Sequence, residues 1–222
     1  MKRLIAVVIF LTFACLLFGG DLKAVLTRMD QGASEFHSMT ANLTMVTYTA
    51  ILDDKTTENG ELKMVKGKDS TQAIIHFTGA NEERTIGFFN KQIQLYTPKL
   101  HLVQVYKLGR NAKFLDQYLL LGFGTSGADL QKGYDVQLAG AEQVNGQQMS
   151  KLILTPKEAA IKEQLSKAEI WIPEASGYPA QQKFYFPSGN YRLVTYTNFQ
   201  LNPQLGQLKL NTPPKTKVEY PQ

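Results

Sequence analysis

The chain has 222 residues, of which 43% are hydrophobic, 10% aromatic and 19% charged. This material suffices for one sizeable core or two small ones, and it is too apolar for a disordered protein. With one cysteine and three histidines, the chain cannot form an intramolecular disulfide or a cysteine-cluster metal site, so we expect no metal and no cofactor. The net charge of +5 is dispersed and forms no Lys/Arg stripe between aromatic residues, so nucleic-acid binding is disfavoured.

Residues 1–20 have the pattern of a secretory signal peptide. Lys2 and Arg3 precede an uncharged, mostly apolar run, Leu4–Phe18, which ends at two glycines. Fifteen residues are too few for a comfortable transmembrane helix. A basic start, a short apolar run and small residues at its end are typical of a signal that is removed. We therefore expect the mature protein, residues 21–222, to work outside the cytoplasm.

Cys15 has two interpretations. The stretch Thr12-Phe13-Ala14-Cys15 loosely resembles the lipobox of bacterial lipoproteins, but Thr12 and Phe13 fit it poorly. This favours a cysteine that is discarded with the signal, and a cysteine-free mature chain suits an oxidising compartment. In the alternative, Cys15 is lipidated and anchors the protein to a membrane.

The mature chain is expected to begin with an amphipathic helix at Asp21–His37, because apolar residues recur at i, i+3 and i+4 there. From Thr40 onward the period changes to two, which predicts strands. The predicted strands are Thr40–Leu52, Gly60–Lys66, Gln72–Phe77, Glu83–Phe89, Gln92–Tyr96, His101–Tyr106, Tyr134–Leu138, Gln148–Thr155, Ala168–Ile172, Gln181–Phe186, Tyr191–Leu201 and Gln207–Leu210.

Turn sequences separate several of these strands, and we predict turns at 58–60, 145–146 and 187–190. An interruption at Asn111–Gly133 contains an apolar helical face and a glycine-rich loop, and a second short helix is expected at Lys157–Ser166. Short strands at this spacing indicate an antiparallel meander, and no strand–helix alternation supports a Rossmann-type domain. The predicted fold class is mostly β (α+β), a single domain with one curved antiparallel sheet of about eleven strands.

The strand pattern places Leu, Ile, Met and Phe residues on one sheet face across about eight strands. A sheet of this size curls strongly, and two or three short helices leave two interpretations open: an apolar cavity beneath a helical lid, or an ordinary filled core. The predicted cavity wall comprises Leu43, Met45, Leu62, Met64, Ile75, Phe77, Phe88, Leu95, Ile170 and Phe184, and the predicted lid comprises Leu119, Leu120 and Phe123.

No catalytic motif has the context that its chemistry requires. Residues 122–127 match G-x-G-x-x-G but follow a helical run instead of a strand, and they lack the Gly-x-Ser-x-Gly frame of a hydrolase. The three histidines have no nucleophile within a known motif, and the paired acidic residues lie in turns without a partner that would raise a pKa. We therefore predict no catalytic residue and a protein that is not an enzyme.

The order of these parts resembles the LolA-like family of periplasmic outer-membrane lipoprotein carriers, the lipoprotein-sorting proteins. It runs from the signal through an amphipathic helix and six strands to a helical lid and a second run of strands. The local matches are Phe36–Val46 at the first helix-to-strand junction, then 60–62 (Gly-Glu-Leu), 154–157 (Leu-Thr-Pro-Lys) and 212–214 (Thr-Pro-Pro). Together they cover essentially the whole mature chain.

This resemblance implies an incomplete β-barrel whose apolar cavity takes acyl chains of lipoproteins, or of other lipids, and carries them toward the outer membrane. It also implies an inner-membrane release complex and an outer-membrane acceptor as partners, and we expect a monomer. Lipoprotein carriers of the family place an Arg after the second strand, where it holds the lid closed; the matching residue here is Lys66, followed by Gly67. Lys lacks the planar fork of Arg and would hold a lid less specifically. This difference weakens the expectation of a lipoprotein cargo more than the expectation of a lipid-binding cavity. The alternative function is a membrane-tethered lipid-binding or sensing module, anchored through Cys15.

Overall fold

The computed structural model describes residues 21–221, except for 69, 80–82 and 110–117. The predicted signal at residues 1–20, the possible lipidation site Cys15 and most of the predicted helical run at the start of the lid lie outside the described residues. Within the described part of the chain, no helix is long and apolar enough to span a membrane.

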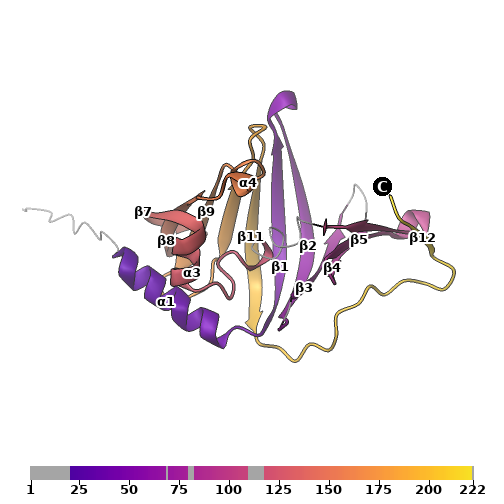
Figure 1. Cartoon of the computed structure of the whole chain (residues 1–222), viewed down its shortest axis with the longest axis horizontal. Helices are drawn as coiled ribbons and strands as arrows, with labels where there is room; N and C mark the ends of the chain where they lie inside the picture. Colours follow the sequence, from indigo (N-terminus) through magenta and orange to yellow (C-terminus); the bar gives the residue numbers. More distant parts are fainter. Residues whose placement is uncertain (1–20, 69, 80–82, 110–117, 222) are drawn as a thin grey trace, which may run out of the picture.

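One twelve-stranded sheet dominates the molecule, in the order β12-β6-β5-β4-β3-β2-β1-β11-β10-β9-β8-β7 (Figure 1). Neighbouring strands are antiparallel, except that β12 runs parallel to β6, and the sheet does not close because β7 and β12 do not pair. This confirms the predicted open, mostly antiparallel sheet. The strands are β1 (Ser38–Thr49), β2 (Asp54–Lys66), β3 (Thr71–Thr78), β4 (Arg84–Phe89), β5 (Gln92–Thr97), β6 (Leu102–Lys107), β7 (Tyr134–Val144), β8 (Gln147–Pro156), β9 (Lys167–Pro173), β10 (Gln181–Tyr185), β11 (Tyr191–Leu201) and β12 (Lys217–Glu219).

The N-terminal helix α1 (Leu22–Glu35) begins at Asp21, whose carboxylate accepts a hydrogen bond from the Lys23 amide. It lies with α3 (Gly127–Gly133) beside the β7–β9 end of the sheet (Figure 1). Its apolar stripe, including Val25 and Met29, joins the same core as buried residues of β8 and β9. A further short helix, α4 (Ala159–Lys162), lies where the sequence predicts one.

Two local predictions at the strand ends are wrong. Residues 58–60 lie inside β2, and the chain instead turns through the 3₁₀ segment η1 (Ala50–Leu52) and Asp53, whose φ is 47°. Gly60 is required for close strand packing, since a Cβ there would lie 2.6 Å from the His76 carbonyl oxygen. Residues 207–210 form no strand, and the last strand is β12, which lies further along the chain and pairs with β6.

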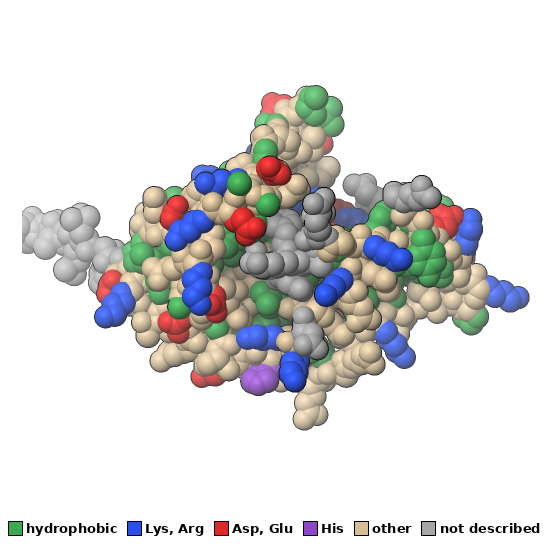
Figure 2. Space-filling model, viewed as in Figure 1, with side chains coloured by type: hydrophobic (Ala, Val, Ile, Leu, Met, Phe, Trp, Pro, Cys, Tyr) green, Lys and Arg blue, Asp and Glu red, His purple; other side chains and the backbone are tan. Residues whose placement is uncertain are grey.

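The β1–β2 hairpin projects beyond the rest of the sheet (Figure 1). At its tip, Ile51 and Leu52 are 91% and 71% exposed, and hydrophobic side chains are visible at the end of this projection (Figure 2). A second 3₁₀ segment, η2 (Pro98–Leu100), makes the corresponding turn between β5 and β6.

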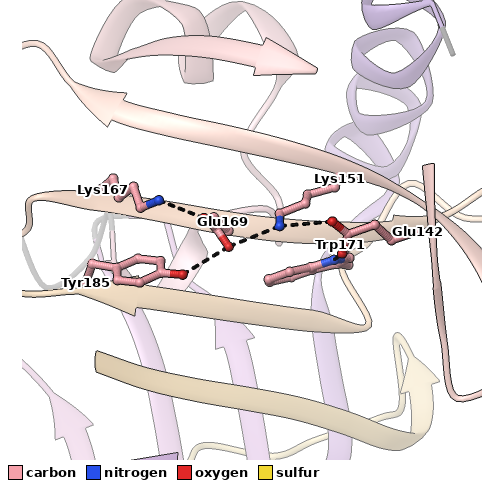
Figure 3. A network of polar contacts seen from close by, with 6 residues as sticks. All are labelled: Glu142, Lys151, Lys167, Glu169, Trp171 and Tyr185. Carbon is pink, nitrogen blue, oxygen red and sulfur yellow. Dashed lines mark hydrogen bonds and ion pairs between the residues drawn. The ribbon is translucent and has the colours of Figure 1, made fainter. Parts of the chain in front are cut away.

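A polar network joins the four strands β7, β8, β9 and β10 (Figure 3). Its residues Glu169 and Trp171 alternate with Ile170 along β9, so they lie on the opposite face of the sheet from Ile170. The centre of the network is Glu169, whose side chain is only 8% exposed. The carboxylate accepts hydrogen bonds from Lys167 Nζ at 2.8 Å and Tyr185 Oη at 3.2 Å, and it lies 3.4 Å from Lys151 Nζ. Lys151 in turn donates to Glu142, which also accepts from the Trp171 indole at 2.7 Å.

This network predicts an acid-sensitive contribution to stability. Burial pushes the pKa of Glu169 upward, but the hydrogen bond from Lys167 and the charge of Lys151 outweigh it, so the pKa lies below its usual value of 4.5. A carboxylate whose pKa is lowered by folding stabilises the fold above its unfolded pKa, and this stabilisation is lost as pH falls through the folded value. We expect the free energy of unfolding to fall as pH drops below about 4.5, and to fall less steeply in Glu169→Gln.

Urea denaturation at a series of pH values from neutral to acid tests this expectation. Glu174→Gln, which removes an exposed carboxylate from the segment after β9, is the control and should follow the wild-type pH curve. Parallel pH curves for Glu169→Gln and the wild type would contradict the assignment.

Candidate functional site

An apolar cavity of about 180 Å³ lies between the inner sheet face and residues 118–119. Aliphatic and aromatic side chains supply most of its wall, and a few polar groups interrupt it. The lining residues are Leu43, Met45, Leu62, Met64, Ile75, Phe77, Arg84, Ile86, Phe88, Tyr118, Leu119, Gln182, Phe184, Arg192, Val194 and Tyr196.

Strand register brings these side chains onto one face. Leu62 of β2 lies opposite Ile75 of β3, which lies opposite Ile86 of β4. On the other side of β2, Leu43 of β1 lies opposite Tyr196 of β11. Directly paired residues point to the same side of a sheet, so a period-two pattern in separate strands becomes one continuous apolar surface.

Eight of the ten predicted wall residues line the cavity, and two do not. Leu95 lies opposite Ile86 and therefore shares the face, but β5 is one strand beyond the cavity. Ile170 lies opposite Gln182 on the same face, yet it is fully buried in the core. The loop at Gly122 covers it, because a Cβ on that glycine would lie 3.7 Å from Ile170 Cδ1.

The predicted lid residues have three different environments. Leu119 lines the cavity, and Leu120 is half-buried against the core. Phe123 is only 1% exposed and does not line the cavity. Its ring packs among those of Phe36 and Tyr196, at 6.4 and 5.2 Å between centroids, so it anchors the loop in the core.

Lys66 lies against the loop that follows the lid residues. Its Nζ donates to the carbonyl oxygens of Gly124 at 3.3 Å and Ala33 at 3.4 Å. The loop approaches closely here: Gly124 has φ of +69°, and a Cβ on it would lie 2.7 Å from Phe36 Cδ1. Lys66 thus joins β2, α1 and the loop, but through two long hydrogen bonds from an exposed side chain.

Polar groups of the cavity are mostly paired with one another. The Arg84 guanidinium binds the Glu58 carboxylate through both terminal nitrogens and lies 4.3 Å from the centre of the Phe77 ring. Tyr196 donates to Gln182 Oε1 at 2.6 Å, and Gln182 donates to the Leu121 carbonyl oxygen. Burial raises the pKa of the Tyr196 hydroxyl, so it stays protonated and serves as a hydrogen-bond donor.

The predicted wall and lid lacked seven of the lining residues, namely Arg84, Ile86, Tyr118, Gln182, Arg192, Val194 and Tyr196. Val194 and Tyr196 share their parity along β11, a signal that could have placed them on the inner face. Arg192 continues the same parity, and a cation on an apolar face is the signal for a functional position. Tyr118 belongs to the same predicted apolar helical face as Leu119, and that periodicity is the signal that could have placed it at the cavity.

The lining of the cavity suits an apolar ligand. Its wall joins aliphatic and aromatic surface to a few fixed polar groups, which is the usual composition of small-molecule sites. Among the residues that the structure describes, no group of three or more His, Cys, Asp or Glu side chains could hold a metal ion.

Comparisons with known proteins show similarity in fold. No family model matches the sequence, and no curated protein matches it. A search of solved structures finds the Mycobacterium tuberculosis lipoprotein LppX, which is 13% identical, with a TM-score of 0.51 over 83% of this chain and 99% of LppX. The two proteins share a fold.

Two further structures extend this comparison. A conserved protein of Thermus thermophilus is 12% identical, with a TM-score of 0.52 over 90% of this chain and 98% of the other. A LolA superfamily protein of Nitrosomonas europaea is 13% identical, with a TM-score of 0.39 over 82% of this chain and 94% of the other. At 12–13% identity, these comparisons concern the fold alone.

Proposed function

We propose that the protein is a periplasmic carrier that binds acyl chains of lipoproteins or of other lipids and moves them toward the outer membrane. The observation that supports this proposal is the apolar cavity between the inner sheet face and residues 118–119. Binding, not catalysis, is the role that its lining favours. Residues 1–20 would direct export, and tethering through Cys15 would make the same site a membrane-bound sensor.

The cavity volume implies that the lid region moves when a chain enters. At about 180 Å³, the cavity is close in size to an engineered cavity of about 150 Å³ that binds benzene. It therefore accommodates only the first few carbons of an acyl chain. Tyr118 and Leu119 form the side of the cavity opposite the sheet, and their displacement would lengthen it along the apolar face.

The energetics fit a transient carrier. Burial of an acyl chain gains about 0.8 kcal/mol for each CH₂ group. Ten buried groups give roughly 8 kcal/mol, which is near micromolar affinity before ordering costs are subtracted. A carrier must also release its load, so tighter binding would not serve it.

Lys66 bears on the choice of cargo. Its two long hydrogen bonds to carbonyl oxygens would hold the loop less firmly than the bidentate donors of an Arg. We therefore include lipids other than lipoproteins among the ligands. An inner-membrane donor and an outer-membrane acceptor are the partners that such a carrier would require.

Native mass spectrometry of the protein purified from the periplasm tests the proposal. We expect added masses that dissociate as lipid on activation. Val194→Phe tests whether the lipid occupies the cavity. Val194 is 8% exposed and lines the cavity, so the larger side chain should fill part of it and reduce the amount of bound lipid. Protein that is lipid-free and takes up no added fatty acid would overturn the proposal.

A further inference from the structure

A second, more polar hollow of about 430 Å³ adjoins the apolar cavity. Its wall comes from β1, from the start of β11, from the turn before β11 and from the two residues that follow α4. The lining residues are Thr47, Glu163, Gln164, Phe186, Pro187, Ser188, Asn190, Tyr191 and Arg192. Arg192 lines both this hollow and the apolar cavity, and so joins the two.

The strand register explains the position of Arg192. It lies opposite Thr47 of β1 and Phe184 of β10. Two residues further along β11, Val194 lies opposite Met45 on the apolar wall. Successive inward-facing residues of β11 therefore belong to different surfaces: Val194 lies on the apolar wall, and Arg192 lies at the polar hollow.

The two arginines of the cavity differ in what they can bind. Arg84 already holds the Glu58 carboxylate through two nitrogens. Among the described residues, Arg192 has no carboxylate within ion-pair distance; its side chain interacts with the Tyr118 hydroxyl and lies 5.6 Å from the Phe186 ring centre. A guanidinium presents several donors in a plane and matches the oxygens of a carboxylate or phosphate.

We propose that Arg192 binds the acidic headgroup of an amphiphile whose acyl chain occupies the apolar cavity. The headgroup, a carboxylate or a phosphate, lies in the polar hollow, where the hydroxyl groups of Thr47 and Ser188 are further donors. This inference rests on the proposed function and names its ligand class as acidic lipids. The Glu163 carboxylate, which also lines the hollow, opposes an anion and limits the affinity.

Fluorescence titration with cis-parinaric acid and with its uncharged methyl ester at pH 8 tests the proposal. Both probes carry the same chain, so the ratio of their affinities reports the headgroup alone. We expect the wild type to bind the acid roughly tenfold more tightly than the ester, and Arg192→Gln to bind the two about equally. Glu163→Gln should increase the preference for the acid, and Arg192→Lys should retain part of it.

Lys63→Gln is the matched control. Lys63 is exposed on β2, between Leu62 and Met64, which line the apolar cavity. The variant removes a positive charge from a position of opposite parity, so it should leave the acid-to-ester ratio unchanged. Titration with lysophosphatidylglycerol tests whether a phosphate headgroup binds in the same way. Displacement of the acid probe by inorganic phosphate, which has no acyl chain, would indicate a site for free anions and would overturn the proposal that the ligand is an amphiphile.

The outcomes separate this inference from the function on which it rests. If the wild type binds acid and ester equally, or if Arg192→Gln keeps the wild-type ratio, the headgroup assignment is wrong while chain binding stands. If Arg192→Gln weakens both probes equally, Arg192 acts through Tyr118 and the lid, which also overturns the assignment. A wild type that binds neither probe would overturn the carrier function and the inference together.

Discussion

Replacing Phe77 with Glu is expected to lower the affinity for an acyl-chain probe roughly a hundredfold or more. Phe77 is 3% exposed and lies in the cavity wall, opposite Gly60 and Arg84. An ionised carboxylate in an apolar wall costs about 3 kcal/mol or more. The nearby Arg84 cannot offset this cost fully, because the Glu58 carboxylate already occupies it.

Ile74→Glu is the matched control for this variant. Ile74 lies on the same strand β3, faces the other side of the sheet and lies opposite Lys63. Ile74→Glu introduces the same negative charge on the face away from the cavity, next to the Lys63 ammonium. The affinity of this variant for the probe should therefore equal that of the wild type. Far-UV circular dichroism should show a folded sheet in both variants, and Val194→Phe blocks the cavity without a charge if Phe77→Glu does not fold. Unchanged probe binding in folded Phe77→Glu would show that the chain does not enter this cavity.

The inner face could be predicted because its information is local to each strand. The alternation of Leu62 and Met64 with polar residues fixes which side of β2 is apolar, and Ile75 and Phe77 do the same for β3. Since directly paired residues of neighbouring strands point to the same face, knowing which residues of each strand face inward was enough to predict most of the wall. The same argument would have included Val194, which belongs to the same pattern on β11.

The position of the cavity along that face could not be predicted in this way. Ile170 and Phe184 have the same inward orientation, yet one lies beneath the Gly122 loop and the other lines the cavity. The difference depends on where a loop distant in sequence crosses the sheet. The Gly60 error has a similar origin, since the close approach of β3 requires the glycine there, whereas its sequence context indicates a turn.

Replacing Phe123 with Ala is expected to lower the free energy of unfolding by about 3–5 kcal/mol. The ring is almost fully buried among those of Phe36, Tyr196 and Phe199. Its removal leaves a cavity and takes away the anchor of the loop that follows residues 118–120. Urea denaturation followed by circular dichroism measures the loss.

Leu119→Ala supplies the comparison that distinguishes an anchor from a ligand contact. Leu119 is half-buried and lines the cavity, so its truncation should cost about 1 kcal/mol of stability, below the usual range for fully buried leucines, and should reduce the affinity for an acyl probe. If Phe123→Ala instead keeps wild-type stability and loses probe binding, Phe123 touches the ligand in the bound state. That result would mean that the loop swings its aromatic residue out of the core and into the cavity when a chain enters. If both expectations hold, the loop at Phe123 is the fixed end of the lid, and opening occurs at Tyr118 and Leu119.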